Sequence, residues 1–418
     1  MNRKKIFITI IIIIIGITIG GIFYYINKNK KSNVTVTDSS SEYEEFDPFG
    51  TSTNESEETS NKEESDVKET TQFYRVSDEP ISSAIFYLEK KYLSVPKTTE
   101  TVDEKTGETK TTEINYEMVP SIRFIERATG HINSYELSSK KTSEISSTTI
   151  PGIEESFFNE NGDTVIYRYL SSDNKTIKTF LAQLGKAQGE FLTENIDYVI
   201  TNSEKNKIFY LIRDNSSVNG YYRNFENSSS AENIFTNSYS EWIPQWINDN
   251  TIYFTTKASY SFKGSVFAYN LKTKTFKKIF GGIYGLTTLS SNDGNKILYN
   301  ESNGSNSYLS IFDVKNNKTI ETRIFGLPEK CVWDEDNISI YCAVPNSTSS
   351  KLPDSWYQGL TSFNDKFIKI NSNIGSYEDL FNSITVTQVD AINLFMDNNQ
   401  SKIFFTNKKD YTLWVLKL

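Results

Sequence analysis

The sequence predicts an all-β fold, a seven-bladed β-propeller, and three observations point to it. Beyond residue 73, short alternating runs of Ile, Phe, Tyr and Val are separated by clusters of Asn, Gly, Asp and Ser, a pattern typical of strands and turns. Runs of similar sequence recur at a nearly constant spacing. Each interval has room for about four short strands, which is the content of one propeller blade.

The repeat is defined by the last aromatic residue of each apolar run. These residues are Phe124, Tyr167, Tyr210, Phe254, Tyr299, Tyr341 and Phe405. The intervals between them are 42 to 45 residues, except for the last, which is 64 residues. Seven copies with a period in the low forties predict seven blades.

Composition excludes several classes of function. The chain has 418 residues, with 53 acidic against 44 basic side chains and a formal net charge of −9. Nucleic-acid binding depends largely on clustered Lys and Arg, so we expect no nucleic-acid partner. His131 is the only histidine, which rules out most histidine-based metal sites and Ser/His/Asp nucleophile systems. We therefore expect neither a metal nor a cofactor.

Residues 1–32 are expected to form an N-terminal membrane anchor. The 21 residues from Ile6 to Ile26 carry no charge and, at about 1.5 Å per residue, are long enough to cross a bilayer core as one transmembrane helix. A cleaved signal peptide is the alternative, but its apolar region would be shorter and would end in a small-residue cleavage site. Three basic residues precede the span and three follow it, so charge leaves the orientation open.

Residues 33–72 are expected to be a disordered acidic linker. The segment contains 12 acidic and two basic residues and few apolar ones. Such a composition cannot bury enough apolar surface to offset the entropy lost on ordering. A solvated tether is the favoured interpretation, and an acidic docking tail is the alternative. The propeller is then expected to occupy residues 73–418.

The fifth repeat predicts a complete blade. Its inner strand is expected at residues 283–290, followed by strands at 296–301, 308–314 and 319–324. The first turn of this blade contains Asn and Gly, which tolerate the positive φ angles of tight hairpins.

The seventh blade is expected to borrow its outer strand. Strands at about 385–395, 402–407 and 411–418 leave no later segment for a fourth. Residues 73–76 precede the inner strand of blade one and have no other role, so we expect this N-terminal strand to complete the last blade. Such a closure removes open sheet edges. Insertions are expected at residues 94–119 in blade one and 345–362 in blade six.

One turn carries a family resemblance. Residues 291–299, Ser-Asn-Asp-Gly-Asn-Lys-Ile-Leu-Tyr, and more loosely residues 159–167, resemble the Ser-Pro-Asp-Gly-Lys-x-Ile-x-Tyr turn of TolB-type, WD-like propeller repeats, which also form the propellers of the dipeptidyl peptidase IV class. Every copy here lacks the proline. Residues 123–131 and 353–359 are also similar to membrane-anchored bacterial propeller proteins of unassigned function. The resemblance covers the chain from about residue 73 onward and implies no catalytic motif.

The two cysteines are expected on neighbouring strands of blade six. Cys331 and Cys342 flank the turn at 334–337, and antiparallel pairing about that turn places them opposite one another or one pair diagonal, near disulfide reach. Two unpaired buried thiols are the alternative. A disulfide favours an oxidising compartment. With the anchor, it predicts a propeller outside the cytoplasmic membrane.

Catalytic signatures are scarce in this sequence. It contains no Gly-x-Ser-x-Gly and no zinc-type histidine pair. A propeller glycosidase would need two facing carboxylates near the axis, and the acidic residues on or near the inner strands are Glu154, Glu155, Glu241 and Asp390. Solvent-facing lining of the channel is the favoured interpretation of these residues.

Aromatic loop residues are the candidate binding site. In standard propeller winding, Trp356, Tyr357 and Gln358 of the blade-six insertion lie on the same face as Tyr260 and Phe262. Exposed Trp and Tyr on loops are typical of peptide or sugar recognition. The alternative is that the insertion folds back and Trp356 fills a gap between blades.

The combined prediction is a monomeric, membrane-anchored propeller outside the cytoplasm. We expect it to act as a non-catalytic binding or scaffold module for a protein, peptide or glycan partner in the cell envelope. Because propellers serve many functions, this expectation depends on architecture and on the lack of catalytic motifs. A glycan-processing enzyme that uses axial carboxylates is the alternative.

Overall fold

The computed structural model describes residues 70–102, 109–186, 189–225 and 230–418. The predicted anchor at residues 1–32 and all but the last three residues of the predicted linker lie outside this part of the chain. Within the described ranges, no helix combines the length and the apolar character that a membrane span requires.

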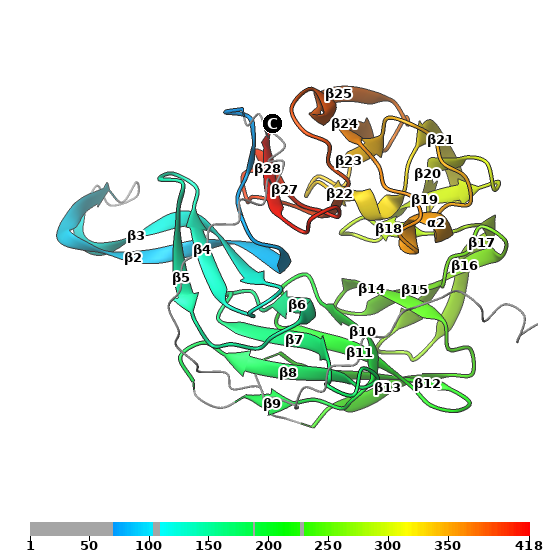
Figure 1. Cartoon of the computed structure of the whole chain (residues 1–418), viewed down its shortest axis with the longest axis horizontal. Helices are drawn as coiled ribbons and strands as arrows, with labels where there is room; N and C mark the ends of the chain where they lie inside the picture. Colours follow the sequence, from blue (N-terminus) through cyan, green and yellow to red (C-terminus); the bar gives the residue numbers. More distant parts are fainter. Residues whose placement is uncertain (1–69, 103–108, 187–188, 226–229) are drawn as a thin grey trace, which may run out of the picture. The chain divides into compact units, whose positions relative to one another are not determined.

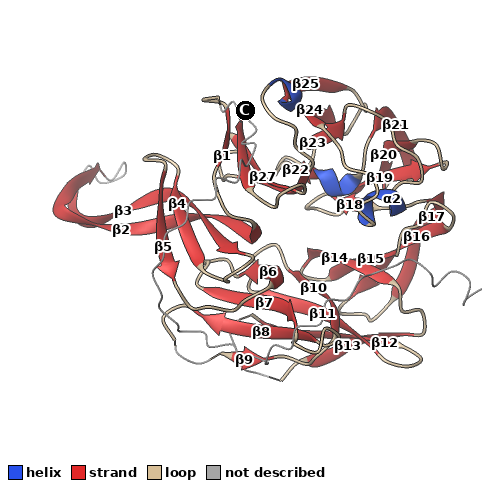
Figure 2. Cartoon of the chain, viewed as in Figure 1, coloured by secondary structure: helices blue, strands red, loops and turns tan. Residues whose placement is uncertain are grey.

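Seven four-stranded antiparallel sheets make up the fold, and each sheet is one blade (Figures 1 and 2). In the first six blades the strands pair in sequence order. Blade one contains β2 (Ile81–Val102), β3 (Thr109–Glu126), β4 (Ile132–Glu136) and β5 (Lys141–Ser146). Blade two contains β6 (Ile153–Phe158), β7 (Thr164–Leu170), β8 (Ile177–Gln183) and β9 (Glu190–Phe191). Blade three contains β10 (Ile196–Thr201), β11 (Lys207–Arg213), β12 (Val218–Asn224) and β13 (Glu232–Asn237).

Blades four to six follow the same order. Blade four contains β14 (Trp242–Asn248), β15 (Thr251–Thr256), β16 (Lys263–Asn270) and β17 (Phe276–Tyr284). Blade five contains β18 (Thr288–Ser290), β19 (Lys296–Ser302), β20 (Ser307–Asp313) and β21 (Lys318–Phe325). Blade six contains β22 (Cys331–Trp333), β23 (Ser339–Pro345), β24 (Asp365–Asn371) and β25 (Tyr377–Asn382). The described helical elements are short turns, namely α2 (Asp354–Tyr357) and the 3₁₀ turns Pro328–Lys330 and Ser383–Thr385.

Blade seven is built from both ends of the described chain. Its strand order is β1 (Phe73–Arg75), β28 (Leu413–Lys417), β27 (Lys402–Asn407) and β26 (Ala391–Met396). β1 pairs antiparallel with β28, and Phe73 lies opposite Leu416. The blue β1 and the red β28 lie side by side in Figure 1. Phe73 is fully buried there, with ring centroids of Phe381 and Trp414 at 4.9 and 5.3 Å.

The repeat found in the sequence corresponds to the second strand of each blade. The seven aromatic residues that define it lie on β3, β7, β11, β15, β19, β23 and β27. These strands are apolar on successive positions because neighbouring blades cover both of their faces, as in any sheet that is buried on two sides. The predicted all-β, seven-bladed propeller is confirmed.

The hydrophobic core consists mainly of interfaces between consecutive blades. Six apolar clusters each join one blade to the next, and a seventh joins blade seven to blade one. In that seventh cluster, Phe404 and Val415 pack with Ile81 and Ile122. The first strands of consecutive blades also contact one another, as β2 does β6 and β10 does β14. The first strands therefore surround the axis of the ring.

Two predicted inner strands begin later than expected. In blade five the strand starts at Thr288 instead of residue 283, because the preceding residues complete β17 and the chain then turns at Gly285, whose φ is +64°. In blade seven it starts at Ala391 instead of about 385, because the 3₁₀ turn Ser383–Thr385 occupies the connection. The blade-one insertion is a continuation of β2 and β3, which remain paired from Ile81 to Val102.

Candidate functional site

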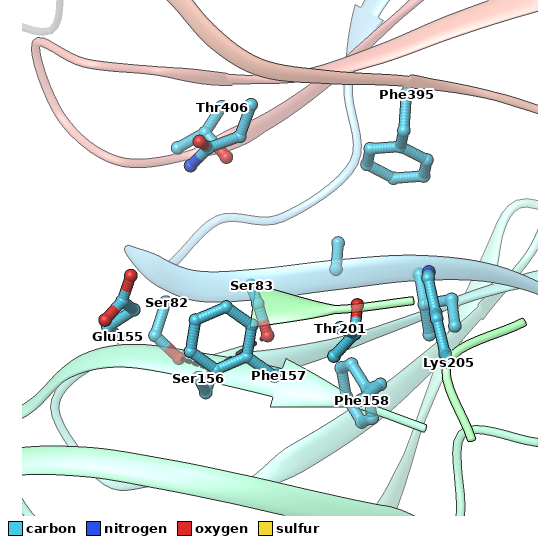
Figure 3. Close-up of a pocket in the computed structure, with 13 residues that line it drawn as sticks. Ser82, Ser83, Glu155, Ser156, Phe157, Phe158, Thr201, Lys205, Phe395 and Thr406 are labelled. Atoms are coloured by element: carbon cyan, nitrogen blue, oxygen red, sulfur yellow. Dashed lines mark hydrogen bonds between the residues drawn. The ribbon is translucent and has the colours of Figure 1, made fainter. Parts of the chain in front are cut away.

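A pocket of about 240 Å³ lies between inner strands that surround the axis of the propeller, and Figure 3 shows the residues that line it. The inner strands of blades one, two and seven form most of it, and the end of β10, the turn after β10 and one residue of β27 form the rest. Its lining residues are Ser82, Ser83, Ala84, Ile85, Glu155, Ser156, Phe157, Phe158, Thr201, Lys205, Asn393, Phe395 and Thr406. Hydroxyl groups and phenylalanine rings dominate this lining, and its charged residues are Glu155 and Lys205.

Three serine hydroxyls form a bridge between blades one and two. The Ser156 hydroxyl lies 2.6 Å from that of Ser82 and 2.7 Å from that of Ser83. β2 and β6 approach closely here because small side chains face each other at the axis. The cluster presents to the pocket a polar wall that can both donate and accept hydrogen bonds.

Lys205 lies at the end of the pocket opposite Glu155 in Figure 3. It belongs to the turn between β10 and β11, and its φ is +50°. Among the described residues its ammonium group has no hydrogen-bond or ion-pair partner. Burial lowers the pKa of Lys205 below its usual value, because a partly desolvated ammonium is less stable in its charged form.

Asn202 holds this turn in place. Its side-chain oxygen accepts hydrogen bonds from the backbone N–H groups of Asn206 and Lys207, at 3.0 and 2.9 Å. Its carbonyl oxygen accepts from the N–H of Lys205 at 2.9 Å. The backbone that carries Lys205 is therefore fixed by local hydrogen bonds.

Glu155, the other charged lining residue, is neutralised. Its carboxylate pairs with the buried guanidinium of Arg168, which also donates to the carbonyl of Ile196 in blade three. Arg168 thereby links two blades beside the axis, and the negative charge of Glu155 is compensated within the protein.

The other three acidic residues singled out in the sequence are also in ion pairs. Glu154 pairs with Arg127. Glu241 pairs with Arg213 at 2.5 Å and with Lys257 at 3.2 Å. Burial alone raises the pKa of Glu241, but the hydrogen bonds and charges of these two partners outweigh it and leave the pKa below its usual value.

Asp390 belongs to a buried charge cluster. Lys330, which is fully buried, lies 2.5 Å from Asp390 and 2.9 Å from Asp365, both of which are also buried. The backbone N–H of Ala391 donates to Asp365 at 2.7 Å. Burial raises the pKa of Asp365 to about 6, although the nearby charge of Lys330 opposes the rise. This cluster joins the start of blade six to the start of blade seven.

Trp356 is not exposed, which corrects one prediction. It is 3% exposed and its indole nitrogen donates to Asp390. The amine of Lys408 lies 4.0 Å from the indole ring centroid. The insertion of blade six folds back onto the charge cluster. There the indole N–H has a hydrogen-bond acceptor and the indole ring is removed from water, a combination that an exposed position would not provide. The alternative weighed for Trp356, that of filling a gap between blades, describes its position better.

The other predicted binding residues are more accessible. Tyr357 is 46% exposed and Phe262 is 73% exposed. Gln358 is exposed and Tyr260 is half-buried. The backbone N–H of Tyr260 donates to Asp354 in the insertion at 2.6 Å, so the two loops meet as expected.

Tyr357 marks a second polar contact at the axis. Its hydroxyl donates to Glu329, whose other oxygen accepts from Thr287 at 2.9 Å. Burial raises the pKa of Glu329. Although the Tyr357 side chain as a whole is 46% exposed, desolvation of its hydroxyl, together with the charge of Glu329, raises the pKa of Tyr357 well above its usual value.

Cys331 and Cys342 form a disulfide between the paired strands β22 and β23, where they lie directly opposite one another. His131 contacts Thr149 and Glu144 on blade one, away from the pocket lining. In the described ranges, no group of three or more His, Cys, Asp and Glu side chains is placed to hold a metal ion.

Sequence reasoning missed Lys205, Lys330, Asp365 and Glu329. Lys205 had one usable signal, because it occupies the turn position at which blades two and five carry glycine. The other three stand in segments that match no motif, and their importance comes from burial that only the folded chain creates.

Comparisons with known proteins support the fold. No protein-family model matches the sequence, and no curated protein matches it. An oligogalacturonate lyase in complex with manganese is similar at a TM-score of 0.51 and 10% identity, covering 79% of this chain and 98% of the lyase. TolB from Acinetobacter baumannii is similar at 0.42 and 12% identity, covering 77% of this chain and 79% of TolB.

The β-propeller domain of the Trilobed protease from Pyrococcus furiosus is also similar, at a TM-score of 0.46 and 11% identity, over 79% of this chain and 94% of that domain. At such identities the likeness concerns the fold and carries no function over to this chain.

Proposed function

We propose that this propeller is a non-catalytic binding module that holds a small polar ligand, or the end of a longer glycan or peptide, in its axial pocket. The observation that carries this proposal is that, among the described residues, the pocket contains one unpaired positive charge and no unpaired negative charge. The hydroxyl-lined pocket contains Lys205 without a described partner, while the neighbouring carboxylates are in ion pairs. A concave site with a few convergent polar groups is the usual form of a ligand site.

The ion pairs argue against acid–base chemistry at these carboxylates. A general acid needs a raised pKa and a general base needs freedom to reach a proton on the substrate. Glu154, Glu155 and Glu241 are each held by an arginine, and the pKa of Glu241 is lowered. Such carboxylates stabilise the arrangement of the blades and are poorly suited to proton transfer.

We place this module at the outer side of the cytoplasmic membrane, as a monomer on an acidic tether. Two features support the location. The Cys331–Cys342 disulfide favours an oxidising compartment, and the apolar run from Ile6 to Ile26 has the length of a membrane span.

A glycan-processing enzyme is the second candidate function, and Glu329 is the observation that favours it. Glu329 has a raised pKa, accepts a hydrogen bond from Tyr357 and lies in the 3₁₀ turn just before the inner strand β22. A protonated carboxyl group and a tyrosine in contact can act as proton donors.

A ligand screen with product analysis separates the two functions. The full chain in detergent is heated with neutral sugars, sugar acids, oligosaccharides and short peptides, and each compound is then analysed by mass spectrometry. The proposal predicts a raised melting temperature with the compound recovered unchanged. New products that disappear in a Glu329→Gln variant would replace the binding function with the enzymatic one. No stabilisation by any compound would contradict an axial binding function for these ligand classes.

A further inference from the structure

We propose that the axial pocket is an anion site in which Lys205 provides the positive charge, and that its ligand is a compact hydroxylated carboxylate such as a sugar acid. This inference rests on the proposed binding function and names the class of ligand. It follows from the charge, the backbone and the lining of the pocket, taken in turn below.

The charge of the pocket is unbalanced in favour of an anion. Its two charged lining residues are Glu155 and Lys205, and Glu155 is compensated by Arg168. Lys205 has no ion-pair partner among the described residues. A partly buried ammonium without a counter-charge is unfavourable, and a bound carboxylate offsets that cost through a charge-assisted hydrogen bond.

The backbone at Lys205 has a conformation that suits glycine better. In the corresponding turn of blade two, Gly162 donates its N–H to Asn159, just as Lys205 donates to Asn202. Gly294 of blade five has the same hydrogen bond and a φ of +71°. A side chain other than Gly is disfavoured at positive φ. Asn337 of blade six and Gln400 of blade seven have the same backbone cost at this turn position. Lys205 adds to it the desolvation of an ammonium group that has no described partner.

The turn also directs the side chain toward the preceding blade. A Cβ atom built on Gly162 would lie 3.4 Å from Arg123 and 3.8 Å from Ile85, so this turn position faces the preceding blade. At the equivalent position in blade three, Lys205 faces blade two, where Phe157 and Phe158 line the pocket. Because Asn202 fixes the turn, the ammonium group is presented without a large loss of backbone entropy on binding.

The lining fits a hydroxylated ligand better than a bare inorganic anion. The hydroxyls of the serine bridge and of Thr201 and Thr406, with the amide of Asn393, offer donors and acceptors around the pocket. Phe157, Phe158 and Phe395 provide apolar faces. The volume of about 240 Å³ is below the range of roughly 300–1,000 Å³ for drug-sized ligands, so it suits a single sugar ring.

The test is calorimetric titration of the full chain in detergent with sodium D-glucuronate, D-glucose and inorganic phosphate. We expect glucuronate to bind, and glucose and phosphate to bind at least about tenfold more weakly, since each lacks one half of the recognised chemistry. Lys205→Gly should weaken glucuronate binding by about tenfold or more and leave glucose binding unchanged. Lys274→Gly is the matched control, because Lys274 has a φ of +57° on an exposed outer turn.

The outcomes separate this inference from the binding function itself. Equal binding of glucose and glucuronate, with Lys205→Gly behaving as wild type, would overturn the anion site while leaving an axial binding pocket intact. Phosphate binding as tightly as glucuronate would overturn the hydroxylated-ligand assignment. No binding of glucuronate at millimolar concentration would overturn the inference as a whole. The melting temperature of Lys205→Gly should not fall, which excludes misfolding as the cause of lost binding.

Discussion

The indole nitrogen of Trp356 donates hydrogen bonds to both carboxylate oxygens of Asp390, at 3.2 and 3.1 Å. The two residues come from different blades, since Trp356 lies in the insertion of blade six and Asp390 precedes the inner strand of blade seven. Lys330 completes the contact by pairing with Asp390. A loop that could have been a mobile binding arm is thereby fixed to the ring.

Replacing the tryptophan should destabilise the fold measurably. Trp356→Phe removes a hydrogen bond to a buried carboxylate, and we expect the free energy of unfolding to fall by about 1–3 kcal/mol. Leu360→Ala is the control, because Leu360 is 78% exposed in the same insertion and its truncation should change stability by less than about 0.5 kcal/mol. Urea denaturation measures both. Equal effects of the two substitutions would contradict the anchoring role of Trp356.

Asp365 should make stability depend on pH in an unusual direction. Burial raises its pKa to about 6, so the folded state keeps the proton to a higher pH than the unfolded state does. The contribution of Asp365 to the free energy of unfolding is therefore fully present at low pH and is lost as the pH rises toward and through 6. Asp365→Asn removes the titration and keeps the shape of the side chain.

The measurement for Asp365 is chemical denaturation of both proteins between pH 4 and pH 7. The variant should gain stability relative to wild type as the pH rises, by about 3 kcal/mol at most over this range. A difference that stays constant with pH would show that Asp365 titrates at its ordinary pKa.

The strand β1 should be essential to blade seven. Phe73 is fully buried between Phe381, Phe405 and Trp414, and Phe73→Ala should cost about 3–5 kcal/mol of stability. The matched control is Phe262→Ala, because Phe262 is 73% exposed. A small effect at Phe73, equal to that at Phe262, would mean that the seventh blade does not depend on its N-terminal strand.

The disulfide should be detectable without a structure. The full chain purified under non-reducing conditions should have no free thiol, and each of Cys331→Ser and Cys342→Ser should expose one. Because the bond closes a loop with a sequence separation of 11, its loss should cost about 2–3 kcal/mol. Two free thiols in the wild-type chain would remove the argument for an oxidising compartment.

The number of blades could be predicted from the sequence because a strand that is buried on two faces has a recognisable apolar run. The second strand of each blade must be apolar along its length, as in Ile297, Leu298 and Tyr299, so it stands out at a regular spacing. The first residue of an inner strand is not marked by such a sequence pattern. Thr288 and Ala391 begin their strands at points set by a glycine turn and a 3₁₀ turn, which the repeat period does not contain.

The candidate site was harder to predict because its residues act through positions that the fold creates. The turn that contains Lys205 has the sequence of an ordinary charged surface turn. The position of Lys205 in the pocket depends on its positive φ and on the neighbouring blade. Trp356 in a polar loop has the pattern of an exposed binding residue, and its burial depends on Asp390, which is 34 residues away in sequence. Long-range pairings of this kind have no spacing rule.

The binding of an axial ligand without its conversion is tested most directly by blocking the pocket. Calorimetry would compare the full chain with Thr201→Trp, which places a large side chain among the lining residues, using the compound that stabilises the wild type most. We predict one equivalent bound by the wild type, the compound recovered intact, and no binding by a Thr201→Trp variant that melts as the wild type does. Undiminished binding by that folded variant, or conversion of the compound by the wild type, would contradict the account.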